Sequence, residues 1–443
     1  MSFASKRDEV VTAGFPVPDP RWARPLFVTL LVLAVGLALW GSRLNPAPIY
    51  DEPEHLKDLA IFAKSGWSQE TFQKKYNYAA TVCYWLPSRF YKEWPTLQTL
   101  RWYSLATMAT GLWLSAVLFR RWTGSWLPGA ALVACPHVIL CMMTYMTEGT
   151  ALLFIAAGLL LMDRALRARG GAEWVWTIAG GLSLGLGIVS RQIWVVVLGG
   201  LALAVWLSFF REDLAKLRRV CALGGLVALA LMAAVVLDTG GMFTGGGGRL
   251  QTQVRLSRGN WLLSLLAFLP VYGMGTWMAL KRMRGGGMTR PWVAGVSVLV
   301  AGVLTLTVVA LDSPHAWMGN GPINRVLQST GLDWFKPLGL FLLAASGLCL
   351  LIEFGRDVTG DRRRPFNEIF ACGSLASTAV LFVFLSFPTP FYERYVMTSY
   401  FCALAGCTLT GQVRAWPWMI QIGLLLLFQA GVLGAKGLFP VAP

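Results

Sequence analysis

Four carboxylates and a histidine lie close together in the segment IYDEPEHLKD, directly after the first long apolar run of the chain. These residues are Asp51, Glu52, Glu54, His55 and Asp58. A helix that starts at the first of them places Glu54, His55 and Asp58 on the same face, because side chains three, four and seven positions apart are neighbours on a helix. A carboxylate in such a cluster can take a proton from a hydroxyl group as a general base.

Helix capping is the alternative explanation of this acidic segment. Asp51 can cap the helix, Pro53 fits its first turn, and Glu52 and Glu54 lie near the positive end of the helix dipole. Capping does not explain why two consecutive acids stand where an apolar run ends. The residue pattern alone leaves both interpretations open.

Glu148 is a second acidic position that needs an explanation. It lies in the segment TYMTEGT, in a short hairpin between two apolar runs. Ionisable groups at membrane depth are costly and usually face an interior cavity or pathway. The alternative is a first-turn acid that follows a Thr147 cap.

Two arginines interrupt apolar sequence in a similar way. Arg191 and Gln192 lie in VSRQIW, and Arg394 lies in FYERY. A guanidinium group suits a phosphate or a carboxylate, which for Arg191 includes Glu148. The alternatives are an interfacial anchor and a structural ion pair.

The apolar runs that carry these residues predict a polytopic all-α membrane protein. The chain has 443 residues, of which 56% are hydrophobic and 14% charged, and runs of about 18 apolar residues are long enough to cross a bilayer. We predict thirteen spans, within a range of 12–14. They are 25–42, 102–119, 127–146, 149–163, 174–190, 193–210, 220–237, 260–280, 292–311, 335–353, 368–386, 396–412 and 416–435.

Loop charges predict the orientation of these spans. Positive residues gather in one set of alternate loops, which favours a cytoplasmic N-terminus. We therefore predict a cytoplasmic segment 1–24, one multi-pass domain over 25–443, and a large extracytoplasmic loop over 43–101 with short interfacial helices. Tyr78 and Trp85 in that loop fit either stacking faces for sugars or an interfacial aromatic belt.

Several other classes of protein are disfavoured. The net charge is +16, but no basic run is long enough to follow a nucleic-acid backbone. The eight cysteines form no CxxC pair and the chain has three histidines, so neither a disulfide framework nor a zinc site is indicated. We expect no metal and no cofactor. The first apolar run lacks the layout of a cleaved signal peptide and is expected to remain as a span.

In their order along the chain, four motifs resemble the signatures of one enzyme family. YDEPEH, TYMTEG, SRQIW and YERYVMTSY resemble those of the dolichyl-phosphate-glucose-dependent α-1,2-glucosyltransferases, which add the terminal glucose to the lipid-linked oligosaccharide. The chain departs from that family at Glu148, where an aspartate is usual, and in the loop TGGGGRLQTQ, where only Arg249 matches. These departures favour a distant relative of that family, and a bacterial source is one option.

The resemblance implies a GT-C-type architecture and an inverting hexosyltransferase. Such an enzyme moves a sugar, here glucose, from a polyprenyl- or dolichyl-phosphate donor to a lipid-linked glycan on the lumenal or periplasmic side. On this basis Asp51 is the expected general base and Glu52 the second candidate. The resemblance also implies that the donor phosphate is bound by Arg191, Arg394 and Gln192. The sugar or the acceptor is expected to be positioned by His55, Glu148, Tyr78 and Trp85.

Three alternatives stay open at this point. One is another GT-C enzyme that transfers mannose or aminoarabinose to a glycan, a lipid or a protein. Another is a transporter or flippase for a lipid-linked sugar, which predicts helices broken by glycine or proline in paired halves, and none is evident in the sequence. The third is a structural membrane subunit. The membrane is the ER membrane in a eukaryote and the inner membrane in a bacterium.

Overall fold

All regular elements in the part of the chain that can be described are helices. The computed structural model describes residues 19–49, 52–74, 82–210, 214–239, 260–271, 275–283, 290–311, 336–360, 366–385, 396–407 and 415–435. Six helices in these ranges are long and apolar enough to cross a membrane. They are Ala23–Leu44, Leu97–Thr123, Glu148–Arg167, Gly171–Ser190, Ala215–Thr239 and Pro337–Gly360. The predicted all-α, multi-pass membrane protein is therefore confirmed.

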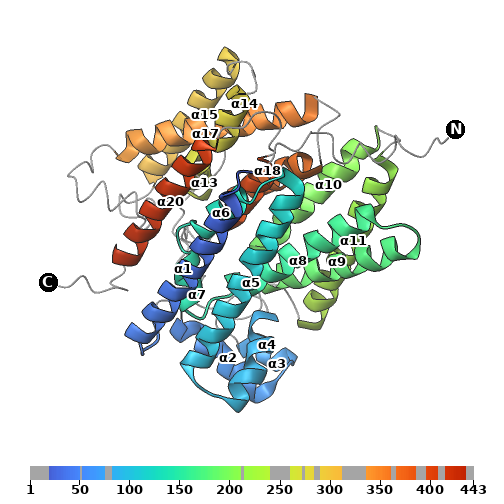
Figure 1. Cartoon of the computed structure of the whole chain (residues 1–443), viewed down its shortest axis with the longest axis vertical. Coiled ribbons are helices and arrows are strands. Elements are labelled where there is room, and N and C mark those ends of the chain that lie inside the picture. The colour runs from blue at the N-terminus through green and yellow to red at the C-terminus, as the bar shows by residue number, and fades with distance from the viewer. Residues whose placement is uncertain are drawn as a thin grey trace.

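The first loop carries three short helices that separate the first two long ones. The elements of this half of the chain are α1 (Ala23–Leu44), α2 (Glu52–Ser65), α3 (Gln69–Lys74), α4 (Val82–Glu93), α5 (Leu97–Thr123), α6 (Leu127–Val133), α7 (Val138–Met143), α8 (Glu148–Arg167), α9 (Gly171–Ser190), the 3-10 helix η2 (Gln192–Val195), α10 (Val196–Ser208) and α11 (Ala215–Thr239). The helices α2, α3 and α4 lie together at one end of the molecule (Figure 1).

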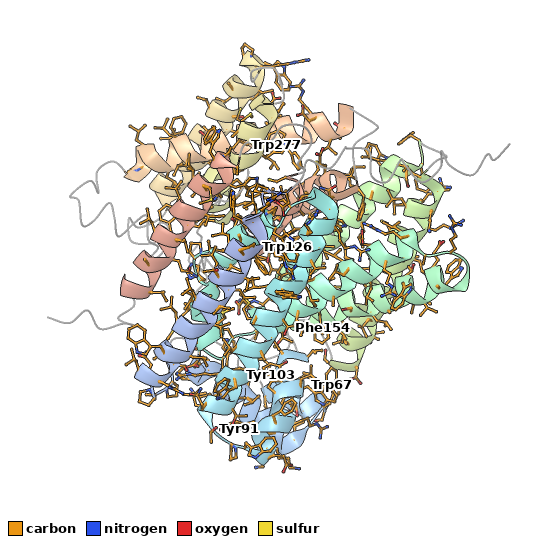
Figure 2. All side chains as sticks on the ribbon, in the orientation of Figure 1. Trp67, Tyr91, Tyr103, Trp126, Phe154 and Trp277 are labelled. Atoms are coloured by element: carbon orange, nitrogen blue, oxygen red, sulfur yellow. The ribbon has the colours of Figure 1, made fainter. Side chains whose placement is uncertain are left out.

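The second half of the described chain has fewer and more widely separated helices. They are α13 (Asn260–Phe268), α14 (Gly275–Met283), α15 (Pro291–Leu311), α17 (Lys336–Gly360), α18 (Phe366–Leu385), α19 (Val396–Ala405) and α20 (Trp416–Ala435). In Figure 1, α14, α15 and α17 lie at the end opposite α2–α4, and Figure 2 shows Trp67 and Tyr91 at one of these ends and Trp277 at the other.

Exposed tryptophans mark both ends of α1. Trp22 and Trp40 are 40% and 55% exposed, and at about 1.5 Å per residue they stand roughly 27 Å apart along the helix. This separation matches the ~30 Å hydrocarbon core of a bilayer, and tryptophan is enriched at both membrane interfaces. The residues between them, mostly leucine, valine, alanine and glycine, make α1 a span.

The first-loop helices have a small core of their own. Leu59 and Phe62 of α2 pack against Phe72 of α3 and Tyr84 of α4; the Phe62 and Tyr84 rings stack with centroids 5.8 Å apart. The other face of α2 is exposed. These amphipathic helices form a compact cap on the ends of α1 and α5.

Two of the predicted spans are broken helices. The predicted span 127–146 is two short helices, α6 and α7, because Pro136 cannot continue a helix and His137 has a left-handed backbone with φ 80°. The predicted span 260–280 is likewise divided into α13 and α14. Side chains of α20 satisfy a carbonyl group at each break: Gln429 Nε2 donates to Cys135 O at 3.3 Å, and Gln421 Nε2 donates to Val271 O.

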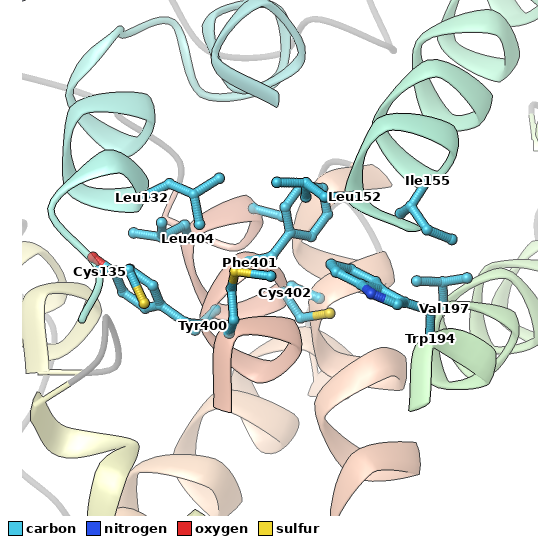
Figure 3. Packing of buried hydrophobic residues seen from close by; sticks show 14 of the residues in the cluster. Leu132, Cys135, Leu152, Ile155, Trp194, Val197, Tyr400, Phe401, Cys402 and Leu404 are labelled. Atoms are coloured by element: carbon cyan, nitrogen blue, oxygen red, sulfur yellow. The ribbon is translucent and has the colours of Figure 1, made fainter. Parts of the chain in front are cut away.

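A short, fully buried helix lies at the centre of the main core. The α19 residues Tyr400, Phe401 and Cys402 pack among side chains of α6, α8, η2 and α10 (Figure 3). Phe401 contacts Trp194 with ring centroids 5.5 Å apart. The helix ends at Ala405, earlier than the predicted span 396–412, whose last residues lie outside the described ranges.

Candidate functional site

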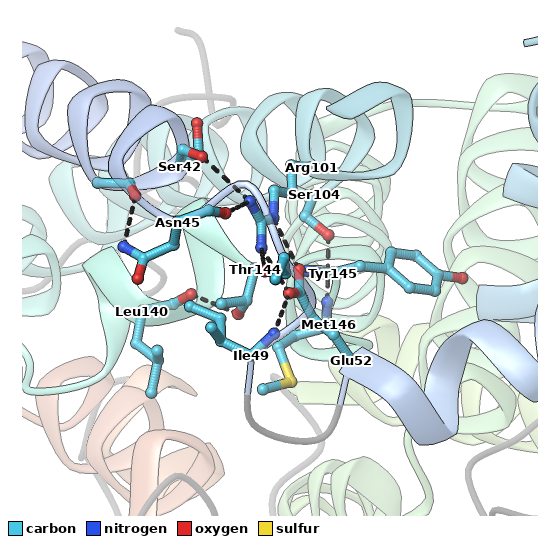
Figure 4. A network of polar contacts seen from close by, with 12 residues as sticks. Ser42, Asn45, Ile49, Glu52, Arg101, Ser104, Leu140, Thr144, Tyr145 and Met146 are labelled. Carbon is cyan, nitrogen blue, oxygen red and sulfur yellow. Dashed lines mark hydrogen bonds and ion pairs between the residues drawn. The ribbon is translucent and has the colours of Figure 1, made fainter. Parts of the chain in front are cut away.

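Glu52 lies fully buried where α2 begins, and both of its carboxylate oxygens are occupied. Arg101 of α5 binds it in a bidentate pair, with Nε 2.9 Å from Oε1 and Nη2 2.7 Å from Oε2. Oε1 also accepts the backbone N–H of Tyr145 at 2.7 Å, and Oε2 accepts that of Ile49 at 2.8 Å. Glu52 therefore joins α2 to α5, to the end of α1 and to the turn between α7 and α8 (Figure 4).

Arg101 completes this junction by binding the chain that follows α1. Its Nη1 donates to Ser42 O at 3.1 Å and to Asn45 O, and its Nη2 donates to Ala47 O at 3.0 Å. All five guanidinium N–H groups are thus used. Together the Glu52–Arg101 pair holds both flanks of residues 50–51.

The buried face of α2 carries three polar residues in line. Glu52, His55 and Asp58 are 0%, 3% and 0% exposed, and their three-residue spacing places them along one side of the helix. Glu54, which the sequence suggested for the same face, is exposed. The predicted face is therefore wrong at Glu54, because α2 turns its 52–55–58 side toward α4 and α5.

Tyr84 of α4 meets this face. Its hydroxyl lies 2.6 Å from Nδ1 of His55. Burial raises the pKa of Tyr84 well above its usual value; the Asp58 carboxylate raises it further and the Arg191 guanidinium lowers it. His55, Asp58 and Arg191 therefore all lie near this one phenol, which stays protonated.

Glu148 and Arg191 form a buried ion pair close by. Arg191 Nη2 lies 3.0 Å from Glu148 Oε1. Glu148 is the first residue of α8, Arg191 follows the last residue of α9, and α4 packs against α9. The ion pair that the sequence suggested between these residues is thus present. Gln192, half-buried, begins η2 directly after it.

Trp85 lies in an aromatic group on the far side of Tyr84. It is half-buried, contacts Trp67 edge to face with ring centroids 6.2 Å apart, and has the Arg89 guanidinium above its ring. Trp67 Nε1 in turn donates to Asp238 at the end of α11. The aromatic group therefore ties the first-loop helices to α11.

Three predicted site residues, Asp51, Tyr78 and Arg394, lie outside the described residues. The structure adds Arg101 and Tyr84 to those that sequence reasoning selected, and it places Asp58 of the acidic segment on the buried face of α2. A usable signal existed for Arg101, an arginine directly before the predicted span 102–119, on the side where positive charge is disfavoured.

The described residues make this a buried cluster of acid, imidazole, phenol and guanidinium groups. No set of three His, Cys, Asp or Glu side chains in the described ranges is arranged to hold a metal ion. The groups present can accept a proton at a carboxylate, donate hydrogen bonds, and pair a guanidinium with an anion.

Comparisons with known proteins give little beyond this geometry. No family model and no curated protein matches the sequence. Among solved structures, the chain is similar to ArnT from Cupriavidus metallidurans in its apo state, with a TM-score of 0.44 and 14% identity over 93% of this chain and 78% of that one. The same protein bound to undecaprenyl phosphate gives a TM-score of 0.41 and 14% identity over 92% and 77%. A likeness at these TM-scores assigns neither a reaction nor a site to this chain.

Proposed function

We propose that the chain is an inverting glycosyltransferase of GT-C type. It moves a sugar, which we take to be glucose, from a polyprenyl- or dolichyl-phosphate donor to a lipid-linked glycan on the extracytoplasmic side of its membrane. The observation that carries the proposal is the buried polar cluster of α2, where Glu52 pairs with Arg101 and His55 contacts Tyr84, together with the buried Glu148–Arg191 pair at the end of α9, against which α4 packs.

Asp51 is the proposed general base. Glu52 already accepts four hydrogen bonds, two of them from Arg101, and these occupy both of its carboxylate oxygens. Glu52 therefore suits positioning better than proton transfer. Its anchoring supports both flanks of Asp51.

The proposed reaction is one displacement at the anomeric carbon. Asp51 accepts the proton of the acceptor hydroxyl, the hydroxyl oxygen forms the new bond to the anomeric carbon, and the bond from that carbon to the phosphate oxygen breaks. The electron pair leaves with the polyprenyl phosphate, which is a good leaving group. Base and phosphate stand on opposite faces of the sugar, so a β-linked donor gives an α-linked product without a covalent enzyme intermediate.

Arg191 is proposed to bind the donor phosphate together with Arg394 and Gln192. A guanidinium can bind a phosphate with two parallel hydrogen bonds. Glu148, 3.0 Å from Arg191 Nη2, orients the guanidinium or binds sugar hydroxyls. His55 positions the acceptor, and Tyr78 and Trp85 supply apolar faces for the sugar rings.

A transporter of lipid-linked sugars is the second candidate, and one observation favours it. The breaks between α6 and α7 and between α13 and α14 are of the kind that forms substrate sites in transporters. The buried first-loop cap distinguishes the two functions, because a transporter has no use for an acid–imidazole cluster held on the ends of two spans.

Transfer by the purified protein in detergent tests the proposal. Radiolabelled polyprenyl-phosphate glucose, mannose and aminoarabinose are each incubated with a lipid-linked glycan, and the acceptor product is separated and counted. We expect transfer from the glucose donor and a loss of about 10²–10⁴-fold in Asp51→Asn. Glu54→Gln, which removes an exposed carboxylate three positions away, is the matched control and retains activity.

Other results would redirect the assignment. Transfer from another donor keeps the reaction class and changes the sugar. A full-rate, folded Asp51→Asn variant rejects the base. Movement of donor lipid across vesicle membranes without any transfer favours the transporter.

A further inference from the structure

We infer that Tyr84 is a positioning residue that fixes the tautomer of His55, so that His55 carries its proton on Nε2 and acts as a hydrogen-bond donor. The tautomer follows from the short contact between the two side chains and from the burial of the Tyr84 hydroxyl. Its use in sugar transfer rests on the proposed function.

The contact between the two side chains is short and shielded from water. The Tyr84 hydroxyl and His55 Nδ1 are 2.6 Å apart, and the residues are 0% and 3% exposed. The rings are tilted by 41° with centroids 5.8 Å apart. Among the residues that the structure describes, His55 is the one hydrogen-bond partner of this hydroxyl.

The direction of the hydrogen bond follows from the burial of Tyr84. Burial raises the pKa of the phenol, so the hydroxyl keeps its proton. A buried O–H group without an acceptor costs about 1–3 kcal/mol. Since Nδ1 is the acceptor in reach, the phenol donates to it, and an Nδ1 that accepts cannot also carry hydrogen. A neutral imidazole at this position then carries its proton on Nε2.

The neighbouring groups support this assignment. On α2, Glu52 is committed to Arg101. From the turn before α8, Tyr145 contacts the His55 ring edge to face with centroids 6.1 Å apart, but its hydroxyl donates to Cys83 O at 2.8 Å.

Two more charged groups flank Tyr84 itself. Asp58 of α2 and Arg191 at the end of α9 both act on its phenol, and Arg191 is paired with Glu148. Of the two phenols beside His55, that of Tyr84 donates to Nδ1 and that of Tyr145 donates to Cys83 O.

A His55 in this tautomer suits a particular partner. Nε2–H is a neutral donor, and it binds an oxygen of a sugar hydroxyl or of a phosphate. It cannot take the acceptor's proton through Nδ1, which leaves proton abstraction to a carboxylate. His55 would therefore hold an acceptor oxygen rather than activate it.

Nitrogen NMR of selectively ¹⁵N-histidine-labelled protein tests the tautomer directly. The chain has only three histidines, His55, His137 and His315, so signals can be assigned by replacing each in turn. We expect Nδ1 of wild-type His55 to show the shift of an unprotonated nitrogen and Nε2 that of a protonated one. The opposite pattern in the wild type overturns the inference.

Two tyrosine variants separate positioning from general stability. Tyr84→Phe should let the Nδ1–H tautomer of His55 become populated and raise the KM for the acceptor about tenfold, with a smaller change in kcat. Tyr145→Phe removes an equally buried hydroxyl hydrogen bond and should change neither the tautomer nor the KM. An unchanged tautomer in Tyr84→Phe, or the same change in both variants, contradicts the role.

The two proposals fail in different ways. If the wild type transfers no sugar, the proposed function is lost and the NMR result still decides the tautomer. If transfer is present and His55 has its proton on Nδ1, the function stands and the inference is wrong.

Discussion

Glu52 and Arg101 are the most heavily committed pair of side chains in the described part of the molecule. Both are buried, and between them they bind five separate backbone groups. Removing one partner of a buried ion pair costs about 3–5 kcal/mol, because the other charge remains buried without compensation. We expect Arg101→Met to lower the free energy of unfolding by this amount, measured by thermal unfolding in detergent.

Double replacement isolates the pair itself. The double variant Glu52→Met/Arg101→Met should lose less stability than the two single variants lose in sum, because the double variant leaves no lone buried charge. Arg89→Met, at an exposed arginine of α4, is the control and should change stability by less than about 0.5 kcal/mol. Strict additivity of the two buried replacements would show that the pair is not coupled.

At the residue scale, sequence reasoning identified the charged residues that interrupt apolar runs. It did not identify functional candidates among the many polar and aromatic residues of the first loop. Glu148 and Arg191 stood out because they interrupt apolar runs, and they form the ion pair that was suggested. Arg101 was not selected, because nothing in the sequence shows that the carbonyl groups of Ser42, Asn45 and Ala47 converge on it. Tyr84 was one aromatic residue of many in the first loop.

At the scale of elements, the antiparallel α8–α9 pair brings Glu148 and Arg191 together. Glycines allow the close approach: a Cβ atom on Gly158 would lie 2.9 Å from Gly180 O, and one on Gly187 would lie 2.7 Å from Ile155 Cγ1. Small residues at such contacts are typical of packed membrane helices. The start of α8 and the end of α9 are therefore fixed relative to each other by packing along the helices.

The two ends of α8 offer a matched test of phosphate binding. Arg191→Gln removes the guanidinium beside Glu148 and should weaken binding of polyprenyl phosphate about 10–100-fold, the value of a charged hydrogen bond. Arg121→Gln removes a guanidinium that pairs with Asp163 at 2.8 Å, about 22 Å along the same helix, and should leave affinity unchanged. Binding is measured by native mass spectrometry, and equal losses in both variants would argue against a phosphate site at Arg191.

Helix existence was more predictable than helix continuity. Apolar composition located every described span, because length and hydrophobicity decide whether a segment enters a bilayer. It did not reveal the breaks in 127–146 and 260–280, since a broken helix is as apolar as an intact one. What permits a break is a partner for the carbonyl groups it releases, and that partner lies far away in the sequence.

At the scale of the whole molecule, α20 supplies the donors to the carbonyl groups at both helix breaks. It is the last described helix along the chain. Its glutamines donate to Cys135 O between α6 and α7 and to Val271 O between α13 and α14. Both glutamines are buried, whereas Leu427 on the same helix is exposed. The C-terminal helix thus connects an early and a late break in the bundle, an arrangement that no local sequence pattern could predict.

Replacement of Gln429 by leucine tests this whole-molecule role. The variant removes the side-chain donor of the Cys135 carbonyl, which keeps its hydrogen bond from the Val138 N–H at 3.1 Å. The loss of this one hydrogen bond costs about 0.5–1.5 kcal/mol. We expect a lower unfolding temperature in detergent for Gln429→Leu and no change for Leu427→Ala on the exposed face. Gln421→Leu should add its own loss, because each carbonyl group is bound by its own glutamine at a different break. A Gln429→Leu variant as stable as the wild type would mean that the α6–α7 break holds without α20, and the last helix would then be peripheral to the bundle rather than part of what keeps it together.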